Sequence, residues 1–332
     1  MRLLRPTDRG LYCEPGDFHV DPWAPVARAV VTHAHGDHLA FGCGSYLVSS
    51  DGVEVTRRRL GAEADVRALE YGAAIDVNGV RVSLHPAGHI LGSAQVRLEH
   101  GGEVWVVSGD YKTDPDPTCR PFEPVRCHTF VTESTFGLPV YRWPPQADVL
   151  HEVHLWWRAN QQAGRTSLLY GYALGKAQRL LAGLDPSIGP ILTHGAVERM
   201  TAAYRDTGVP LPPTTHAAAM DRADRGRAIV LAPPSADGST WVRRFGEHAT
   251  AFASGWMLIR GTRRRRSLDR GFPLSDHVDW PGLMAAIEAT GASRVLVTHG
   301  YTGPVVRWLR ERGLDAEAVA TRYEGERDDD AE

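Results

Sequence analysis

The stretch VVTHAHGDHLA, residues 30–40, places His33, His35, Asp37 and His38 within six positions, directly after an apolar run. The apolar run predicts a short buried strand, and the polar cluster begins where that strand should end. Composition alone would produce the spacing H-x-H-x-x-H only roughly 0.03 times in a chain of this histidine content. Imidazole and carboxylate groups are ligands that divalent first-row metals accept, so the cluster predicts a site for one or two metal ions.

The composition indicates a folded protein without a disulfide framework. With 332 residues, of which 42% are hydrophobic, the chain is long enough for one large domain or two ordinary ones. Its four cysteines include no C-x-x-C pair, which argues against a disulfide scaffold and a cysteine zinc site. The formal net charge of −3 excludes no anionic partner, because a local basic patch can bind polyanions.

The N-terminal stretch MRLLRPTDRGLY has no long apolar core, and no other stretch approaches the apolar length needed to cross a bilayer. We therefore expect a soluble, cytoplasmic protein with no membrane contact.

The order of sequence patterns predicts an α/β protein in which one domain interrupts another. Residues 1–137 alternate short apolar runs with turns, including a hairpin turn at Gly101 and Gly102. From about residue 140, helical and strand patterns alternate, which predicts a separate parallel sheet. The first pattern returns at about residue 271. We therefore expect one domain from residues 1–139 and 271–332, with residues 140–270 inserted into it.

Further motifs follow the histidine cluster in a fixed order. VDP supplies Asp21, HPAGHILGS supplies His89 and VVSGDY supplies Asp110, each just after a predicted strand. With the cluster H-x-H-x-D-H at His33 to His38, this series resembles the metallo-β-lactamase superfamily. The resemblance implies the αββα sandwich of that superfamily and assigns Asp21 to structural support of the histidine loop.

Later motifs narrow the resemblance to the β-CASP branch of nucleic-acid-processing nucleases, which carries an inserted domain. The motifs are VTESTFG at 131–137, GYALGKAQRLL at 171–181, PLSDHVDW at 273–280 and VLVTHG at 295–300. The implied β-CASP domain, with a parallel sheet flanked by helices, is residues 140–270.

The resemblance implies two divalent metal ions, zinc with manganese as the alternative. One would be held by His33, His35, His89 and Asp110, and the other by Asp37, His38, Asp110 and His299, so that Asp110 bridges. Asp37 counts as a catalytic residue as well as a ligand. The stretch ILTHG at 191–195 imitates the motif of His299, but His194 falls inside the insertion, and we interpret it as a non-ligand.

The implied reaction is phosphodiester hydrolysis by a hydroxide that the two metals activate. His277 is the candidate general acid, and Glu133 is expected to orient its other ring nitrogen and favour the charged ring. The alternative is that His277 only packs at a strand end.

Three groups of residues are candidate substrate contacts. Gly175 and Lys176 open a predicted helix, where a phosphate can bind. Ser134 and Thr135 could hydrogen-bond another phosphate. The basic run RGTRRRRSLDRG at 260–271 predicts a nucleic-acid groove, with a solvated face as the alternative; its central residues are Arg263, Arg264, Arg265 and Arg266. We expect Trp156 and Trp157 to be helix core instead of base-stacking platforms.

The compact length and the N-terminal motifs resemble bacterial DNA-ligase-associated exonucleases. That resemblance implies a DNA exonuclease of DNA repair, with DNA as partner and a ligase or helicase of the same pathway as a further one. An RNA-processing β-CASP ribonuclease is the alternative, because motif C is a histidine, as in the RNA enzymes. Two other classes stay open: a metallo-hydrolase of small esters, which would lack Glu133 and His277, and a non-catalytic scaffold that binds nucleic-acid ends.

Overall fold

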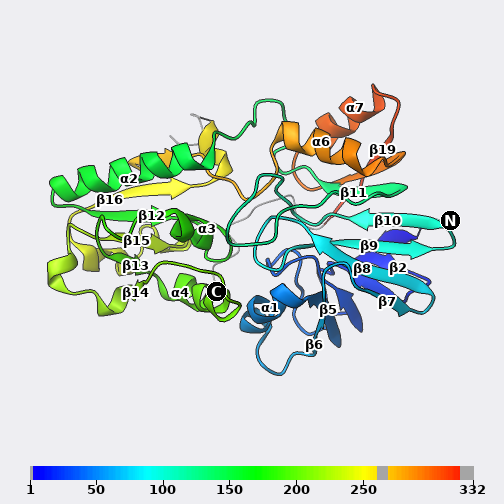
Figure 1. Ribbon diagram of the computed structural model, residues 1–332, viewed down its shortest axis with the longest axis horizontal. Helices are drawn as coiled ribbons and strands as arrows, with labels where there is room; N and C mark the ends of the chain where they lie inside the picture. The colour runs from blue at the N-terminus through cyan, green and yellow to red at the C-terminus, as the bar shows by residue number, and fades with distance from the viewer. Residues whose placement is uncertain (1–2, 260–267, 322–332) are drawn as a thin grey trace. The chain divides into compact units, whose positions relative to one another are not determined.

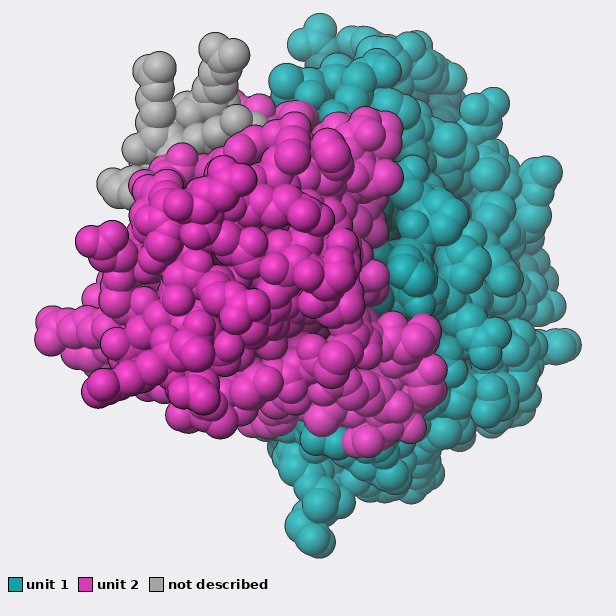
Figure 2. All heavy atoms as spheres, turned by 60° about the vertical axis from the view of Figure 1, so that its left-hand side comes forward, with its two compact units in different colours: residues 1–142, 277–327 teal, residues 143–276, 328–332 magenta. Residues whose placement is uncertain are grey.

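The computed structural model describes residues 3–259 and 268–321 of the chain. The described residues divide into two compact units, one formed by residues 3–142 and 277–321 and the other by residues 143–259 and 268–276. Figure 2 shows the first unit in teal and the second in magenta.

The first unit contains two sheets in its described residues. The strands of the first sheet lie in the order of the chain, antiparallel from β1 to β3 and parallel from β3 to β6. They are β1 (Leu4–Thr7), β2 (Gly10–Cys13), β3 (Phe18–Val20), β4 (Arg28–Val30), β5 (Ser45–Ser49) and β6 (Val66–Leu69). Helix α1 (Val53–Leu60) connects β5 to β6 (Figure 1).

The second sheet has the order β19-β18-β11-β10-β9-β8-β7. Its strands are β7 (Ala74–Val77), β8 (Val80–Pro86), β9 (Ala94–His100), β10 (Glu103–Val107), β11 (Thr129–Glu133), β18 (Arg294–Thr298) and β19 (Asp315–Ala318). The predicted hairpin joins β9 to β10, and both turn residues, Gly101 and Gly102, have positive φ. Strands β8, β10, β11 and β18 run in one direction, so their carboxyl ends share one edge of the sheet.

A hydrophobic layer lies on each face of this second sheet. On one face, Val82 and Val96 pack with Phe18 and Val30 of the first sheet. On the other face, Phe130 and Val295 pack with helices α6 (Trp280–Thr290) and α7 (Thr302–Arg310). This alternation follows from strand geometry, because successive side chains point to opposite faces.

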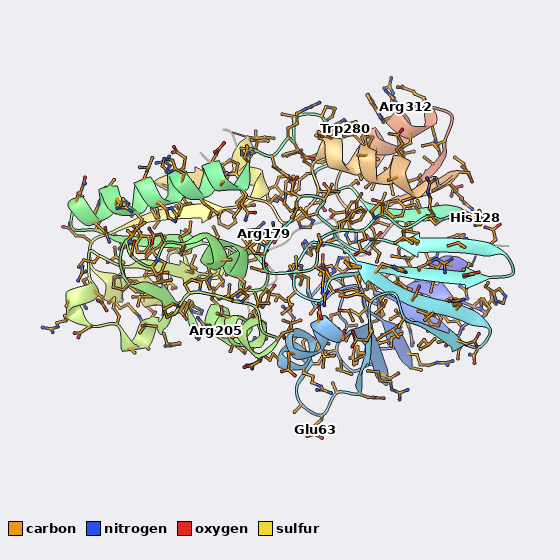
Figure 3. The ribbon with its side chains drawn as sticks, viewed as in Figure 1. Glu63, His128, Arg179, Arg205, Trp280 and Arg312 are labelled. Carbon is orange, nitrogen blue, oxygen red and sulfur yellow. The ribbon has the colours of Figure 1, made fainter. Side chains whose placement is uncertain are left out.

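Aromatic contacts join the two covering helices. The ring centroids of Trp280 in α6 and Trp308 in α7 lie 5.2 Å apart, edge to face. The guanidinium carbon of Arg312 lies 3.4 Å from the centroid of Trp308; Figure 3 labels Trp280 and Arg312. This packing keeps α6 and α7 together over the sheet.

The second unit is built on a separate parallel sheet, as the alternating pattern predicted. Its strand order is β14-β13-β15-β12-β16-β17, and all of its pairings are parallel (Figure 1). The strands are β12 (Thr166–Tyr170), β13 (Ile191–Thr193), β14 (Thr215–His216), β15 (Ile229–Ala232), β16 (His248–Ala253) and β17 (Arg270–Phe272). The helices are α2 (Gln146–Gln162), α3 (Lys176–Gly183) and α4 (Gly195–Asp206). The predicted mixed α/β class is confirmed.

Short 3₁₀ turns complete the described residues. They are η1 (Ser50–Gly52), η2 (Ala217–Ala219), η3 (Arg222–Asp224), η4 (Pro234–Ala236), η5 (Thr240–Phe245) and η6 (Gly255–Leu258). Trp156 and Trp157 of α2 are buried in the core of the second unit with Leu169 and Leu231, so their expected role as helix core is confirmed.

One strand lies in a different sheet from the one that the sequence pattern suggested. We expected residues from 271 onward to return to the first domain, but β17 pairs with β16 in the sheet of the second unit. The units therefore divide between residues 142 and 143 and between 276 and 277. No helix among the described residues combines the length and the apolar character needed to cross a bilayer.

Candidate metal centre

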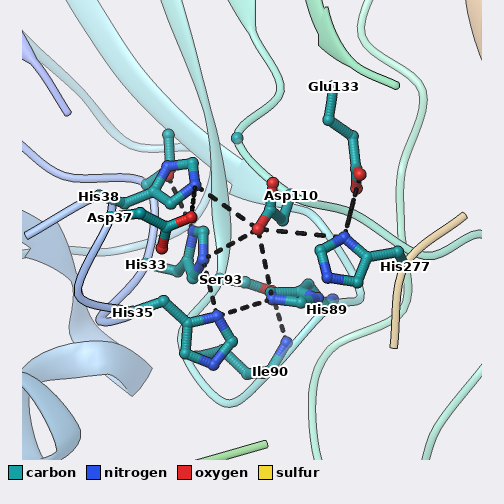
Figure 4. A network of polar contacts seen from close by, with 12 residues as sticks. His33, His35, Asp37, His38, His89, Ile90, Ser93, Asp110, Glu133 and His277 are labelled. Atoms are coloured by element: carbon teal, nitrogen blue, oxygen red, sulfur yellow. Dashed lines mark hydrogen bonds and ion pairs between the residues drawn. The ribbon is translucent and has the colours of Figure 1, made fainter. Parts of the chain in front are cut away.

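The candidate ligands follow strand ends in the first unit. The histidine loop follows β4, and His89, Asp110 and His299 follow β8, β10 and β18. Because three of these strands share one edge of the second sheet, residues far apart in the chain meet there. Figure 4 shows the resulting cluster around Asp110.

The Asp110 carboxylate lies at the centre of a ring of imidazoles. Its Oδ2 lies 3.5 Å from Nε2 of His33, 3.5 Å from Nε2 of His38 and 3.8 Å from Nε2 of His89. Its Oδ1 lies 4.0 Å from Nδ1 of His299. The structure thus brings together the side chains that the sequence motifs singled out.

Two groups of ligand atoms surround this carboxylate. In the first, Nδ1 of His35 lies 3.1 Å from Nε2 of both His33 and His89. In the second, Oδ2 of Asp37 lies 3.7 Å from Nε2 of His38. The potential ligand sets include His33, His35, His89 and Asp110, as well as His38, Asp110 and His299, and in each set the ligand atoms lie within 4.8 Å of one another.

Unpartnered buried atoms indicate that these residues suit a metal. In the described part of the chain, Nε2 of His38 and Oδ1 of Asp110 are buried and have no hydrogen-bond partner. A buried polar atom without a partner costs roughly 1–3 kcal/mol, which coordination would remove. Imidazole and carboxylate donors are the set that zinc accepts, so the residues fit a divalent cation.

Burial and neighbouring charges shift the pKa values of His33, His38 and Asp110. Burial would lower the pKa of His38, but Asp110, Asp37 and Asp21 raise it well above the ordinary value. Burial and the adjacent His38 hold the pKa of His33 well below its ordinary value. Burial would raise the pKa of Asp110, yet His38 and His277 hold it well below the usual range. These shifts favour an ionised Asp110 carboxylate and a protonated His38 ring.

Asp21 and Thr32 hold the histidine loop in place through side-chain contacts. Oδ2 of Asp21 lies 2.8 Å from Nδ1 of His38, and its Oδ1 accepts the backbone N–H of Thr32 at 2.7 Å. The Thr32 hydroxyl donates to the same carboxylate and lies 3.0 Å from Nδ1 of His33. Thr32 also fits against Gly109, where any Cβ would lie 2.5 Å from its hydroxyl. Sequence reasoning missed Thr32, since a threonine before a histidine gives no signal.

The His89 loop is closed by a serine. The Ser93 hydroxyl accepts the backbone N–H groups of His89 and Ile90 at 3.0 and 3.2 Å (Figure 4). This tight turn brings the imidazole of His89, which is 1% exposed, toward Asp110. The run HILGS carried a signal for such a turn, because serine often hydrogen-bonds nearby backbone N–H groups.

Glu133 and His277 form a buried pair next to the cluster. Nδ1 of His277 lies 2.9 and 3.1 Å from the two carboxylate oxygens of Glu133 and 4.0 Å from Oδ2 of Asp110. The backbone N–H of Tyr111 donates to Glu133 at 2.9 Å, which holds the carboxylate in place. The Phe136 ring lies 5.9 Å from His277, so the imidazole is enclosed on that side. The sequence motifs did not indicate the contributions of Tyr111 and Phe136.

The two predicted substrate contacts in the motif A loop are both buried. Ser134 is buried, and its hydroxyl donates to the backbone carbonyls of Thr298 and His299. It therefore anchors the backbone at the candidate ligand His299 instead of facing a substrate. Thr135 is also buried, and among the described residues its hydroxyl has no partner.

The remaining predicted substrate contacts are Gly175 and Lys176 in the second unit and four arginines outside the described residues. Lys176 is fully buried, and its ammonium pairs with Asp276. The predicted open charge for a phosphate is therefore absent at Lys176, because the carboxylate of Asp276 already neutralises it. Gly175 does open α3 with φ of 87°, but Gln178 accepts its N–H at 2.8 Å. Arg263, Arg264, Arg265 and Arg266 lie outside the described residues.

Comparisons with known proteins give matches to parts of longer curated proteins. No protein-family model matches the chain. The chain is 35% identical over 312 residues, 93% of its length, to a probable DNA ligase of Opitutus terrae, of which it covers 30%. It is 33% identical over 124 residues, 36% of its length, to endoribonuclease ysh1 of Schizosaccharomyces pombe, of which it covers 16%. Identity is 29% over 187 residues, 51% of the chain, with cleavage and polyadenylation specificity factor 73 of Drosophila melanogaster, of which it covers 27%.

The chain thus spans less than a third of the length of each of these relatives. By name these relatives fall into two kinds, because the longest of the three matches is to a probable DNA ligase and the other two are to an endoribonuclease and a cleavage and polyadenylation specificity factor.

Proposed function

We propose that the chain is a metal-dependent phosphodiesterase that acts as a DNA exonuclease in DNA repair. The observation that carries the proposal is the position of Asp110, whose carboxylate lies within 4.0 Å of five imidazoles. A single buried carboxylate between two groups of imidazoles suits two cations that share one ligand.

The proposed ligand sets follow the two groups of atoms. One cation would be held by His33, His35, His89 and Asp110, and the other by Asp37, His38, Asp110 and His299. Zinc suits these nitrogen and oxygen donors, and manganese is the alternative. When bound, such a metal pair lowers the pKa of a coordinated water and polarises a phosphoryl oxygen.

His277 is the proposed general acid. Glu133 accepts the hydrogen bond of Nδ1, which leaves Nε2 as the ring atom that can give a proton to the leaving oxygen. The imidazole is 3% exposed, so bulk water competes little for that proton. Glu133 acts through His277 as a positioning residue, and its charge favours the protonated ring.

We assign the two units to the two proposed domains. The first unit would be the metallo-β-lactamase domain and the second the inserted β-CASP domain, with the dividing positions that the structure gives. The length of the match to a probable DNA ligase supports DNA as substrate and a ligase as partner. The proposal places the protein in the cytoplasm and keeps Arg263, Arg264, Arg265 and Arg266 as candidate phosphate contacts.

An RNA-processing ribonuclease is the second candidate, because two of the three similar proteins named above are an endoribonuclease and a polyadenylation specificity factor. The deciding experiment incubates the metal-loaded protein with end-labelled single-stranded DNA and RNA of one sequence, with and without chelator. Asp110→Asn serves as the inactive control. Chelator-sensitive release of mononucleotides from DNA alone supports the proposal, and cleavage of RNA alone replaces it with the ribonuclease. A protein that holds less than one equivalent of metal and cleaves neither would instead be a scaffold.

A further inference from the structure

His194, which imitates a metal ligand in sequence, contributes to a second cluster in the second unit. It lies directly after β13 and is half-buried. Its Nδ1 accepts the backbone N–H of Ala196 at 3.1 Å. In the neutral ring this hydrogen bond fixes the tautomer, so the ring proton is on Nε2.

His216 repeats the same arrangement after β14. Its Nδ1 accepts the backbone N–H of Ala218 at 3.2 Å, so its proton is also on Nε2. Gly195 follows His194 in the chain. A Cβ on Gly195 would lie 3.2 Å from Nε2 of His216. Within residues 3–259 and 268–321, neither Nε2 has a hydrogen-bond acceptor. Two adjacent imidazoles therefore present N–H groups that the described protein leaves unused.

Arg244 adds a guanidinium to these donors. The Trp241 ring packs edge to face against His194, with centroids 4.8 Å apart, and Arg244 lies 5.4 Å from the same indole. Nε of Arg244 donates to the carbonyl of Trp241 at 3.0 Å, which anchors the side chain. In the described part of the chain no carboxylate lies within ion-pair distance of Arg244. Its terminal N–H groups remain available.

The nearby acid does not neutralise this cluster. Glu198, in the first turn of α4, places Oε1 3.2 Å from Arg205 and accepts the hydroxyls of Thr193 and Thr214 on Oε2. Burial lowers the pKa of His194, and the neighbouring His216 and Arg244 lower it further. The site thus combines hydrogen-bond donors with positive potential, which is the chemistry that recognises phosphate.

We propose that His194, His216 and Arg244 form a second phosphate-binding site, which holds the backbone of a nucleic-acid strand away from the scissile bond. The inference rests on the proposed nuclease function, since a processed strand extends beyond the reacting phosphate. Trp241 is the positioning residue that holds His194 and Arg244 together. The site would raise the binding affinity for longer strands without taking part in hydrolysis.

The test measures binding of a fluorescently labelled, cleavage-resistant phosphorothioate DNA strand to the metal-loaded protein by anisotropy. One variant combines His194→Asn with His216→Asn, because asparagine can still cap the following turns while it removes the Nε2 donors. A second variant is Arg244→Gln. The matched control is Arg222→Gln, which removes an equal charge from the surface of the same unit. Unlabelled inorganic phosphate and a short dinucleotide serve as competitors.

Both cluster variants should weaken strand binding by about 3- to 10-fold, and Arg244→Gln should make the slope of log K against log salt shallower by about 0.7. Arg222→Gln should change neither, and hydrolysis of a dinucleotide should stay at the wild-type rate in all variants. Unchanged strand affinity in both cluster variants would overturn the site and leave the nuclease proposal intact. Competition by inorganic phosphate as strong as by the strand would overturn the assignment to nucleic acid. If the wild type neither binds nor cleaves DNA or RNA, the nuclease proposal fails and this inference with it.

Discussion

Asp21 holds His38 through a 2.8 Å contact between Oδ2 and Nδ1, across 17 positions of the chain. Asp21 has φ of 44°, in the left-handed region that aspartate and asparagine tolerate better than most residues. That backbone conformation lets one carboxylate reach both Thr32 and His38. The contact fixes which ring nitrogen of His38 faces Asp110, and outer contacts of this kind tune the affinity of a metal site.

The first prediction concerns Asp21→Asn, which keeps the tolerated φ and the shape of the side chain. It should lower the affinity for the metal that His38 binds by about 10- to 100-fold and leave the other metal bound. Metal stoichiometry after dialysis against a weak chelator measures the effect. Asp17→Asn is the control, since Asp17 has a positive φ but contacts Tyr12 and Arg28. Loss of both metals, or of neither, would contradict the expected separation.

The sequence motifs predicted which residues at the strand ends form the candidate site, but they did not predict where every side chain points. The histidine loop, His89, Asp110 and His299 stand out because their residue types are costly to gather without a ligand. The sequence could not show that Ser134 turns toward the carbonyl of His299, since a hydroxyl binds substrate or backbone equally well.

Contacts between residues far apart in the chain explain the other differences from the sequence prediction. Lys176 follows a glycine at a helix start, a pattern that suits a phosphate site. Its ammonium is instead paired with the carboxylate of Asp276, which lies 100 positions away in the chain. Strand β17 has only three residues, Arg270–Phe272, and its pairing with β16 assigns it to the sheet of the second unit. Such long-range pairings leave no local pattern.

A second prediction follows from the raised pKa of His38. The carboxylates of Asp110, Asp37 and Asp21 raise the pKa of His38 and so favour its protonated form in the metal-free protein, whereas a metal ligand must be neutral. The pKa of His33 and that of His299 are lowered, which favours the neutral form of both rings. Metal binding should therefore release about one proton from His38, as calorimetry in buffers of different ionisation enthalpy measures. Because metal-bound water can add a proton, the comparison is with Asp21→Asn, which should release less. Equal proton release from the wild type and from Asp21→Asn would mean that the proton does not come from His38.

A third prediction uses the backbone behind His299. His299 and Gly300 have positive φ values of 52° and 65°, and a Cβ on Gly300 would lie 2.4 Å from the carbonyl oxygen of Ser134. Gly300→Ala should destabilise the protein by about 1–3 kcal/mol and displace His299 from the site. Gly303→Ala, where a Cβ meets open space in α7, should be neutral or stabilising. Thermal unfolding and metal content are the measurements, and equal behaviour of the two variants would contradict the prediction.

The fourth prediction tests the pairing of Glu133 with His277. Glu133→Gln keeps the shape of the side chain but removes the charge that favours a protonated His277, so kcat should fall by about 10- to 100-fold. Metal content should stay unchanged, because the variant spares every proposed ligand. Glu311→Gln is the control, since that residue forms only an exposed pair with Arg307 in the described chain. A wild-type kcat, or a loss of metal, would remove the proposed positioning role.

The last prediction separates a structural serine from a substrate contact. The Ser134 hydroxyl donates to the carbonyls of Thr298 and His299, so Ser134→Ala leaves two buried acceptors with one donor fewer. The cost should be about 1–3 kcal/mol and should appear as weaker binding of the metal that His299 holds, with KM for the nucleic acid unchanged once metal is in excess.

Thr135→Val is the matched comparison, because the buried Thr135 hydroxyl has no partner among the described residues and valine has nearly the same shape. It should leave stability and metal affinity at wild-type values or above them. A raised KM in Ser134→Ala with full metal content would instead return Ser134 to the role of a phosphate contact, because a lost substrate hydrogen bond acts on binding of the strand and leaves the position of His299 unchanged.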